Sequence, residues 1–150
     1  MEDLVVQAAQ LASAARLTGA NSVSDYTKNA QAIAKAWRKA VHDVNPDRFL
    51  IEALVAPEFD QKIDVLDQET HCAYEFKVSG KGAQSEFYKD VVKIIVWNES
   101  RRNKITRLVF ITEEKFGKPF LDAPMPRAYI KYLEGHGLSV GIAYIKPEAL

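Results

Sequence analysis

The sequence predicts an α/β fold in which helices flank a mixed central β-sheet. Apolar residues recur every three or four positions as far as residue 44, which indicates helices. From residue 49 the apolar period falls to about two, which indicates strands. Beyond that point short β-branched runs alternate with segments of helical length. A chain of 150 residues with 47% hydrophobic side chains is expected to form one domain with a sizeable core.

Two helices are expected first. The apolar stripe of the first consists of Leu4, Ala8, Leu11 and Ala15. Gly19-Ala20-Asn21 then supplies residues that end helices. The second helix begins with Ser24 as its N-cap and ends at Asn45-Pro46-Asp47, because the residue before a proline avoids the helical region. Its apolar stripe consists of Ile33, Ala34, Trp37, Val41 and Val44.

Strands and helices are expected to alternate after this helical pair. A meander of three strands comes first, and Gly80-Lys81-Gly82 breaks it. The expected strands are 49–55, 62–66, 72–78, 107–113 and 138–146, and the expected helices are 83–98 and 125–134. The single domain is therefore predicted to comprise an N-terminal helical pair (1–44), a core with the site (45–115) and a C-terminal α-β extension (116–150).

The charges of the chain are balanced in total but unevenly spread. Residues 51–100 hold 10 acidic and 5 basic side chains, whereas residues 101–150 hold 9 basic and 5 acidic ones. This distribution excludes a highly basic nucleic-acid coat, and it leaves room for a basic rim beside an acidic pocket.

Cysteine content and hydropathy exclude other classes. Cys72 is the single cysteine, so neither an internal disulfide nor a multi-cysteine zinc site can form. No apolar run approaches the ~18 to 20 residues of a membrane helix, and the N-terminus begins acidic rather than with the basic stretch of a secretory signal. We therefore expect a soluble cytoplasmic protein with no membrane partner.

The second and third expected strands carry the candidate site. Alternation along the third strand sends Glu75 and Lys77 to one face. A two- or four-residue turn would oppose Asp64 to Ala73, with Glu75 as its diagonal neighbour, so that both carboxylates share that face. A three-residue turn would place the two carboxylates on opposite faces.

Two carboxylates and a lysine in this arrangement suit a metal. Carboxylates this close repel each other unless a cation lies between them, and hard oxygen ligands prefer Mg²⁺ or Mn²⁺ to zinc. A lysine beside the metal can orient a water and stabilise the charge that builds on a phosphate. The pattern is typical of metal-assisted phosphodiester cleavage.

These residues resemble the signature of the PD-(D/E)XK nuclease superfamily, which has the restriction-endonuclease-like fold. The signature is a carboxylate on one strand of a hairpin followed by (Asp/Glu)-X-Lys on the next, here Asp64 and Glu75-Phe76-Lys77. The expected order helix-strand-strand-strand-helix-strand also resembles the core of that family, over residues 35–115. Ile63 stands where the family pattern has a proline, which leaves Asp60 as an alternative first carboxylate.

The helix after the lysine extends the resemblance. Its Gln84 and Tyr88 are similar to the Gln-X-X-X-Tyr element of the RecB-like and related branches, whose side chains face the site, and residues four apart do share a helix face. Lys77 is implied to act on the water. The implied ligands of Mg²⁺, for which Mn²⁺ would substitute, are Asp64, Glu75 and the main-chain carbonyl of Phe76. The family's further acidic ligand is assigned to Glu52, with Glu58 as the second choice.

A basic cluster is the candidate contact for nucleic-acid phosphates. Its members are Arg101, Arg102 and Lys104, with Arg107 just beyond them. Lys81, in the Gly80-Lys81-Gly82 turn, is a separate candidate for a backbone contact. The cluster also follows a helix C-terminus, where cations offset the helix dipole, so a structural role is the alternative.

The sequence therefore predicts a Mg²⁺-dependent deoxyribonuclease of the PD-(D/E)XK type. Its size suggests a homodimer or a subunit of a larger complex. Two alternatives remain open. One is a non-catalytic binding module of the same fold, and the other is an RNA-cleaving toxin domain with the same metal chemistry.

Overall fold

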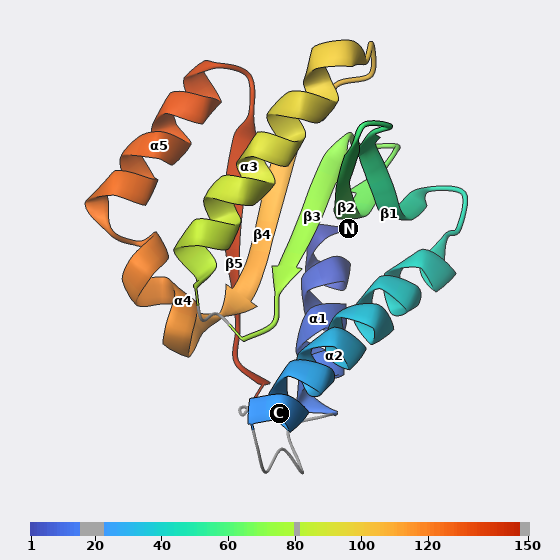
Figure 1. Cartoon of the computed structure of the whole chain (residues 1–150), viewed down its shortest axis with the longest axis vertical. Coiled ribbons are helices and arrows are strands. Elements are labelled where there is room, and N and C mark those ends of the chain that lie inside the picture. The colour runs from blue at the N-terminus through green and yellow to red at the C-terminus, as the bar shows by residue number, and fades with distance from the viewer. Residues whose placement is uncertain (16–22, 80–81, 148–150) are drawn as a thin grey trace.

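A computed structural model describes residues 1–15, 23–79 and 82–147, with the backbone alone for 23–28. It contains a five-stranded sheet in the order β1-β2-β3-β4-β5 (Figure 1). The strands are β1 (Phe49–Ala56), β2 (Phe59–Asp67), β3 (Cys72–Lys77), β4 (Arg107–Glu113) and β5 (Ser139–Ile145). β1, β2 and β3 are antiparallel neighbours, whereas β3, β4 and β5 run parallel. The predicted α/β class with a mixed sheet is confirmed.

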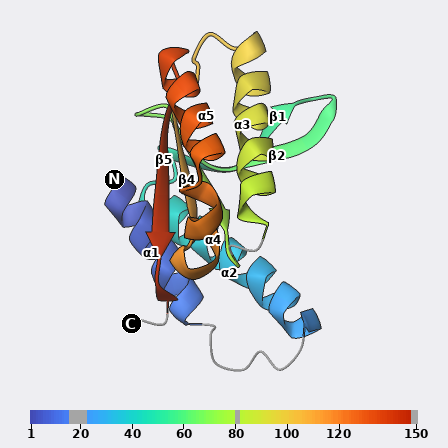
Figure 2. The same ribbon diagram turned by 90° about the vertical axis from the view of Figure 1, so that its left-hand side faces the viewer.

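Helices cover both faces of this sheet. They are α1 (Glu2–Ala14), α2 (Val23–Val44), α3 (Ala83–Ser100), α4 (Glu114–Leu121) and α5 (Pro124–Gly135). α1 and α2 pack on one face, and α3, α4 and α5 pack on the other, as Figures 1 and 2 show together. Each face has its own core, with Trp37 and Phe76 on the first and Phe87 and Phe110 on the second. No helix among the described residues is long and apolar enough to span a membrane.

α2 and α4 show where the local signals hold and where they fail. α2 begins at Val23, one residue before the expected Ser24, and ends at Val44, directly before the predicted stop. The expected stop of the first helix, Gly19-Ala20-Asn21, lies outside the described residues. α4 was not predicted, because Gly117 and Pro119 both discourage helix. Gly117 is needed there, since a Cβ at this position would lie 2.4 Å from Thr112 Cγ2.

The turn between β2 and β3 sets the register that matters for the site. It has four residues, Gln68–His71, and the strands pair Asp67 with Cys72 and Val65 with Tyr74. One further step in this register places Asp64 directly opposite Glu75, not opposite Ala73 as expected. The difference arises because the turn is centred one residue later than predicted. Both registers keep the two carboxylates on the same face of the hairpin.

The side chain of Asp67 organises that turn. Its Oδ1 accepts hydrogen bonds from the main-chain N–H groups of Glu69 and Thr70, and its Oδ2 accepts one from the Thr70 hydroxyl. Arg48 donates to both oxygens at 2.9 and 2.8 Å. An aspartate that bonds to the backbone two and three residues ahead is a common way to shape a turn. Asp67 therefore holds the hairpin in the register that aligns Asp64 with Glu75.

Candidate functional site

Asp64 lies where β2 and β3 stop pairing. The pairing of β2 with β3 ends at Val65 and Tyr74. Two residues further along β3, the main-chain N–H of Phe76 donates to Asp64 Oδ2 at 3.2 Å. A side-chain oxygen thus takes the place of a strand partner, which a buried N–H group requires. The side chain of Asp64 is 26% exposed, so solvent reaches this carboxylate.

Glu75 lies opposite Asp64 in the same register and is more deeply buried. Phe76 faces the core shared with α2, so its neighbours Glu75 and Lys77 face α3. Glu75 is only 3% exposed. Burial raises the pKa of Glu75 well above its usual range, and the negative charges of Asp64 and Asp90 raise it further. The carboxylate pair therefore calls for a nearby positive charge or a proton.

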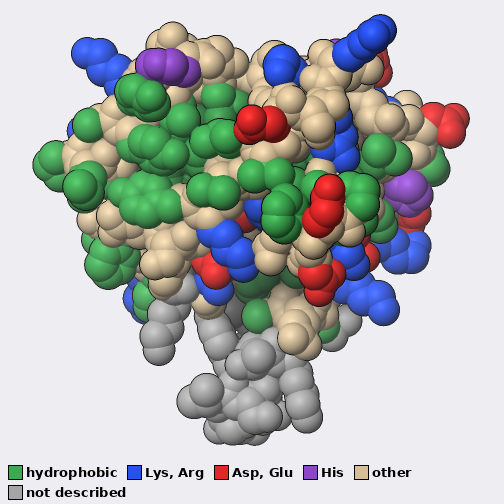
Figure 3. Space-filling view, turned by 45° about the horizontal axis from the view of Figure 1, so that its top comes forward, with side chains coloured by type: hydrophobic (Ala, Val, Ile, Leu, Met, Phe, Trp, Pro, Cys, Tyr) green, Lys and Arg blue, Asp and Glu red, His purple; other side chains and the backbone are tan. Residues whose placement is uncertain are grey.

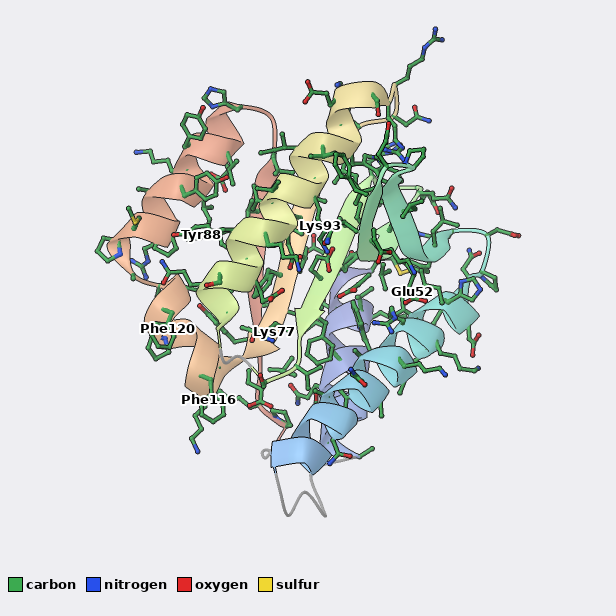
Figure 4. All side chains as sticks on the ribbon, viewed as in Figure 1. Glu52, Lys77, Tyr88, Lys93, Phe116 and Phe120 are labelled. Carbon is green, nitrogen blue, oxygen red and sulfur yellow. The ribbon has the colours of Figure 1, made fainter. Side chains whose placement is uncertain are left out.

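Lys93 of α3 supplies that positive charge, and the sequence analysis missed it. Its Nζ lies 2.7 Å from Glu75 Oε1 and 2.9 Å from Asp90 Oδ1, and it donates to the Lys62 carbonyl at 2.8 Å. Figure 4 shows the side chain between α3 and β3. Burial acts to lower the pKa of Lys93, but the charges of Glu75 and Asp90 outweigh it, so the pKa is raised and the lysine stays charged.

A signal for this lysine was present in the sequence. Asp90 and Lys93 are three residues apart, and helical spacing places them beside Phe87, Val91 and Ile94, which form the buried face of α3. Two charged residues on an apolar helix face indicate a buried ion pair, and a buried lysine requires a carboxylate partner on the opposing strand.

Glu52 of β1 lies at the same level of the sheet as Asp64 of β2. The register pairs Ile51 with Val65 and Ala53 with Ile63, so Glu52 is opposite Asp64. Neighbouring strands β1, β2 and β3 thus each place one acidic residue at this level. Glu52 has a φ of +52°, a left-handed conformation that is uncommon for a residue other than glycine and that stores strain.

The strain at Glu52 coincides with a twist of the β1–β2 hairpin. Ile51 and Val65 pack in the core on the α2 side, whereas Ala53 and Ile63 pack in the core on the α3 side. Residues two apart on one strand normally share a face, so both strands change face at the level of Glu52 and Asp64. The hairpin beyond this point leaves the plane of the sheet, which is visible in Figure 2.

Arg38 of α2 stands between these two acids. One guanidinium nitrogen lies 3.8 Å from Glu52 Oε1, and the other lies 3.9 Å from Asp64 Oδ1. The side chain of Glu52, labelled in Figure 4, is 53% exposed. Arg38 therefore restrains Asp64 from the α2 side, as Lys93 restrains Glu75 from the α3 side.

The donor set fits a hard divalent cation in part. Asp64 and Glu75 are adjacent carboxylates, and the main-chain carbonyl of Phe76 follows directly. Within residues 1–15, 23–79 and 82–147, no group of three or more Asp, Glu, His or Cys side chains could hold a metal ion. Glu52 therefore does not complete such a group. A two-carboxylate site still suits Mg²⁺, which keeps several of its waters when it binds protein.

Lys77 ends β3 on the same side as Glu75. The side chain is partly exposed, and its ammonium has no ion-pair partner among the described residues. Its carbonyl accepts a hydrogen bond from Thr112 Oγ1 at 3.0 Å, which ties the end of β3 to β4. Lys77 thus has a backbone held in place by Thr112 and an ammonium that forms no ion pair with the described residues (Figure 4).

Gln84 and Tyr88 are not brought to the carboxylate pair. They share a helix face as predicted, and Gln84 Nε2 donates to the Tyr88 hydroxyl at 3.1 Å. Tyr88 packs edge-on against Tyr129 of α5, with 5.5 Å between ring centroids. Five residues separate Tyr88 from Lys93, which corresponds to about 140° around the helix. Figure 4 accordingly shows Tyr88 on the α5 side of α3.

The basic cluster lies at the other end of the sheet from Lys77. Arg101 donates to the main-chain carbonyls of Val55 and Leu54 at 2.7 and 3.2 Å and stacks on Trp97 at 3.5 Å. Lys104 donates to the Asn98 carbonyl at 2.7 Å. Arg101 also donates to the Trp97 carbonyl at 3.4 Å, so both side chains bind carbonyls at the C-terminus of α3, which is the structural alternative. The exposed Arg102 has no ion-pair partner among the described residues, and Lys81 lies outside them.

Comparisons with known proteins were made for the whole chain. No family model, curated protein or solved structure matches it. The chemistry of the site therefore has to be inferred from its own residues. Those residues are a carboxylate pair where two strands separate, a buried lysine that neutralises one carboxylate, and a second lysine at the end of the strand.

Proposed function

We propose that this protein is a metal-dependent nuclease that hydrolyses phosphodiester bonds in DNA. The observation that carries the proposal is the alignment of Asp64 with Glu75 at the point where β2 and β3 separate. Lys77 follows on the same side of β3. The order α2-β1-β2-β3-α3-β4 also supports the proposal, because it is the order on which the resemblance to PD-(D/E)XK nucleases depends.

Each side chain has a distinct task in this proposal. Asp64, Glu75 and the Phe76 carbonyl would hold Mg²⁺, which when bound lowers the pKa of a water and offsets charge on the phosphate. Lys77 would orient the attacking water and stabilise the negative charge that develops during hydrolysis. Lys93 opposes the rise in the pKa of Glu75 that burial causes, and the Phe76 N–H with Arg38 fixes the direction of Asp64.

Cleavage of plasmid and oligonucleotide DNA with Mg²⁺ or Mn²⁺ tests the proposal. Asp64→Asn, Glu75→Gln and Lys77→Met are expected to lower the rate by about 100-fold or more, since each removes a charge that the reaction uses. Asn at position 64 can still accept the Phe76 N–H bond, so loss of rate is separable from loss of fold. Unchanged melting temperatures would establish that separation.

Exposed residues on β2 provide the matched controls. Asp60→Asn and Lys62→Met remove the same charges near the site and are expected to leave the rate within about twofold. Loss of cleavage in Asp60→Asn with retention in Asp64→Asn would move the first carboxylate to Asp60. Cleavage that persists in all three site variants would refute the assigned site.

A non-catalytic binding module is the second candidate. The observation that favours it is that Lys93 already pairs with both Glu75 and Asp90, so these buried carboxylates have a cation partner without a metal. DNA binding without cleavage by the wild type, and no heat of Mn²⁺ binding in calorimetry, would support this module. Offering tRNA beside duplex DNA would separate DNA cleavage from RNA cleavage.

A further inference from the structure

The outer side of α3 presents an apolar stripe with a charge at each end. Val92 is 54% exposed and Ile95 is 46% exposed, although both belong to the helix that packs most closely on the sheet. Lys89 precedes them and Glu99 follows them at helical spacing, so the four side chains lie in one row. We call this row the α3 ridge. The opposite side of α3 is buried against the sheet.

Further exposed apolar side chains flank the α3 ridge. Leu54 and Phe59 of the β1–β2 hairpin are 43% and 52% exposed on one side, and Tyr132 of α5 is 59% exposed on the other. A groove of about 200 Å³ separates the ridge from the hairpin and is lined by Phe59, Val92 and Val96, among others. Hydrophobic side chains accordingly gather on the face that Figure 3 presents. Contiguous apolar surface of this kind is characteristic of interaction sites.

The two charges at the ends of the α3 ridge, on Lys89 and Glu99, are opposite in sign and would complement those of a second α3 ridge. Neither Lys89 nor Glu99 has an ion-pair partner among the described residues, and the two are ten residues, about 15 Å, apart. If the α3 helices of two copies lie antiparallel, with a two-fold axis at the level of Ile94 along the helix, each Lys89 meets the Glu99 of the other copy. The same axis would oppose Val92 to Val96. A parallel arrangement would instead oppose like charges, which disfavours it.

We propose that the α3 ridge is a docking surface for a second copy of this chain, in a two-fold symmetric antiparallel contact. Such a contact is self-complementary, as two-fold interfaces are. It places the β1–β2 hairpins of both copies on one side of the helix pair and Tyr132 of both copies on the other. The apolar side chains that flank the α3 ridge are thereby added to the interface. The inference does not depend on the proposed nuclease activity.

Charge reversal tests this contact, with mass measured by light scattering or sedimentation up to about 100 µM. The wild type is expected to dimerise. Lys89→Glu should weaken the dimer about tenfold or more, because two attractive pairs become repulsive. Adding Glu99→Lys to that variant should restore the dimer to within about threefold, since the pairs then re-form with their signs exchanged. Both positions are exposed, so the fold is expected to persist.

Lys115→Glu is the matched control, since it reverses an exposed lysine on α4 and is expected to leave the dimer unchanged. A second variant, Val92→Asp, should give a monomer with an unchanged circular dichroism spectrum, because it places two carboxylates in the centre of the contact. A wild type that remains monomeric at about 100 µM would overturn the proposal. So would a dimer that tolerates both Lys89→Glu and Val92→Asp.

Discussion

At the scale of single residues, the buried ammonium group of Lys93 is held by two buried carboxylates. It is the one ammonium group among the described residues that lies within 3 Å of two buried carboxylates, those of Glu75 and Asp90. A buried pair of this kind adds little stability over an apolar substitute, but removing one partner leaves uncompensated charge in the interior. In the proposed nuclease Lys93 is therefore a positioning residue, because it would act on a substrate only through Glu75.

Replacement of Lys93 by methionine is expected to destabilise the protein by about 3 to 5 kcal/mol, because Glu75 and Asp90 remain buried without a cation. Urea unfolding followed by circular dichroism measures this change. Lys62→Met, an exposed lysine on the adjacent strand, should change the free energy of unfolding by less than about 0.5 kcal/mol. Equal stability of the two variants would contradict the ion pair.

Cys72 is expected to be chemically silent in the folded protein. Burial raises the pKa of its thiol to about 12, and the thiolate is the reactive form. A disulfide reagent at pH 8 should therefore react with Cys72 after unfolding in urea and not before. Reaction of the native protein at the rate of the unfolded chain would contradict the burial of Cys72.

The raised pKa of Cys72 also sets the direction in which the free energy of unfolding changes with pH. The unfolded thiol loses its proton near pH 9, whereas the folded thiol keeps it to about pH 12. Above pH 9 the unfolded state therefore binds fewer protons, and stability falls as the pH rises toward 12. The loss from Cys72 should approach roughly 1.4 kcal/mol per pH unit, and Cys72→Ala should remove that part of the slope.

At the scale of elements, the β2–β3 hairpin decides whether a site can exist. Side chains alternate with a period of two, so a shift of one residue in register would separate Asp64 from Glu75. Asp67 prevents that shift through its bonds to the turn and to Arg48. Burial acts to raise the pKa of Asp67, but the hydrogen bonds of Arg48 and Thr70 outweigh it and hold the pKa below 3.8.

Asp67→Ala is expected to destabilise the protein by about 3 kcal/mol, since the side chain is fully buried and Arg48 loses its partner. The matched control is the exposed Asp60→Ala on the same strand. Because the pKa of Asp67 is lowered in the folded state, its contribution is present above pH 3.8 and is lost as the pH falls below that value. Urea unfolding at neutral and acid pH measures both effects. A difference between the two variants that grows in acid would contradict the assignment.

Local signals in the sequence located most elements but not their mutual orientation. Strand 107–113 was predicted to the residue, and the helix at 83–98 extends only to Ser100. The α4 helix was missed because Gly117 and Pro119 disfavour helix locally, and the close approach to Thr112 that requires a glycine at 117 is a tertiary contact that the local sequence does not show. The predicted pair Gln84 and Tyr88 does share a face. Which face of α3 meets β3, however, depends on packing, and the structure turns Lys93 to the strand and Tyr88 to α5.

At the scale of the whole molecule, Trp37 connects both N-terminal helices to the strand that carries the site. It belongs to α2, is fully buried, and donates from Nε1 to the Val5 carbonyl of α1 at 3.1 Å. Its ring meets Phe76 of β3 edge-on at 5.3 Å between centroids. One side chain thus couples three elements that are far apart in sequence, so disturbing it should affect the molecule as a unit.

Trp37→Ala is expected to lower the free energy of unfolding by about 3 to 5 kcal/mol, because a large cavity opens between α1, α2 and β3. Trp37→Phe keeps most of the packing and removes only the bond to Val5, so it should cost about 1 to 3 kcal/mol. Phe120→Ala, an exposed aromatic of α4, should lie within about 0.5 kcal/mol of the wild type. Hydrogen exchange decides how the loss is distributed. Equal loss of protection in α2 and β3 would show that Trp37 couples them, whereas loss confined to α1 would show that the N-terminal helix unfolds separately from the sheet.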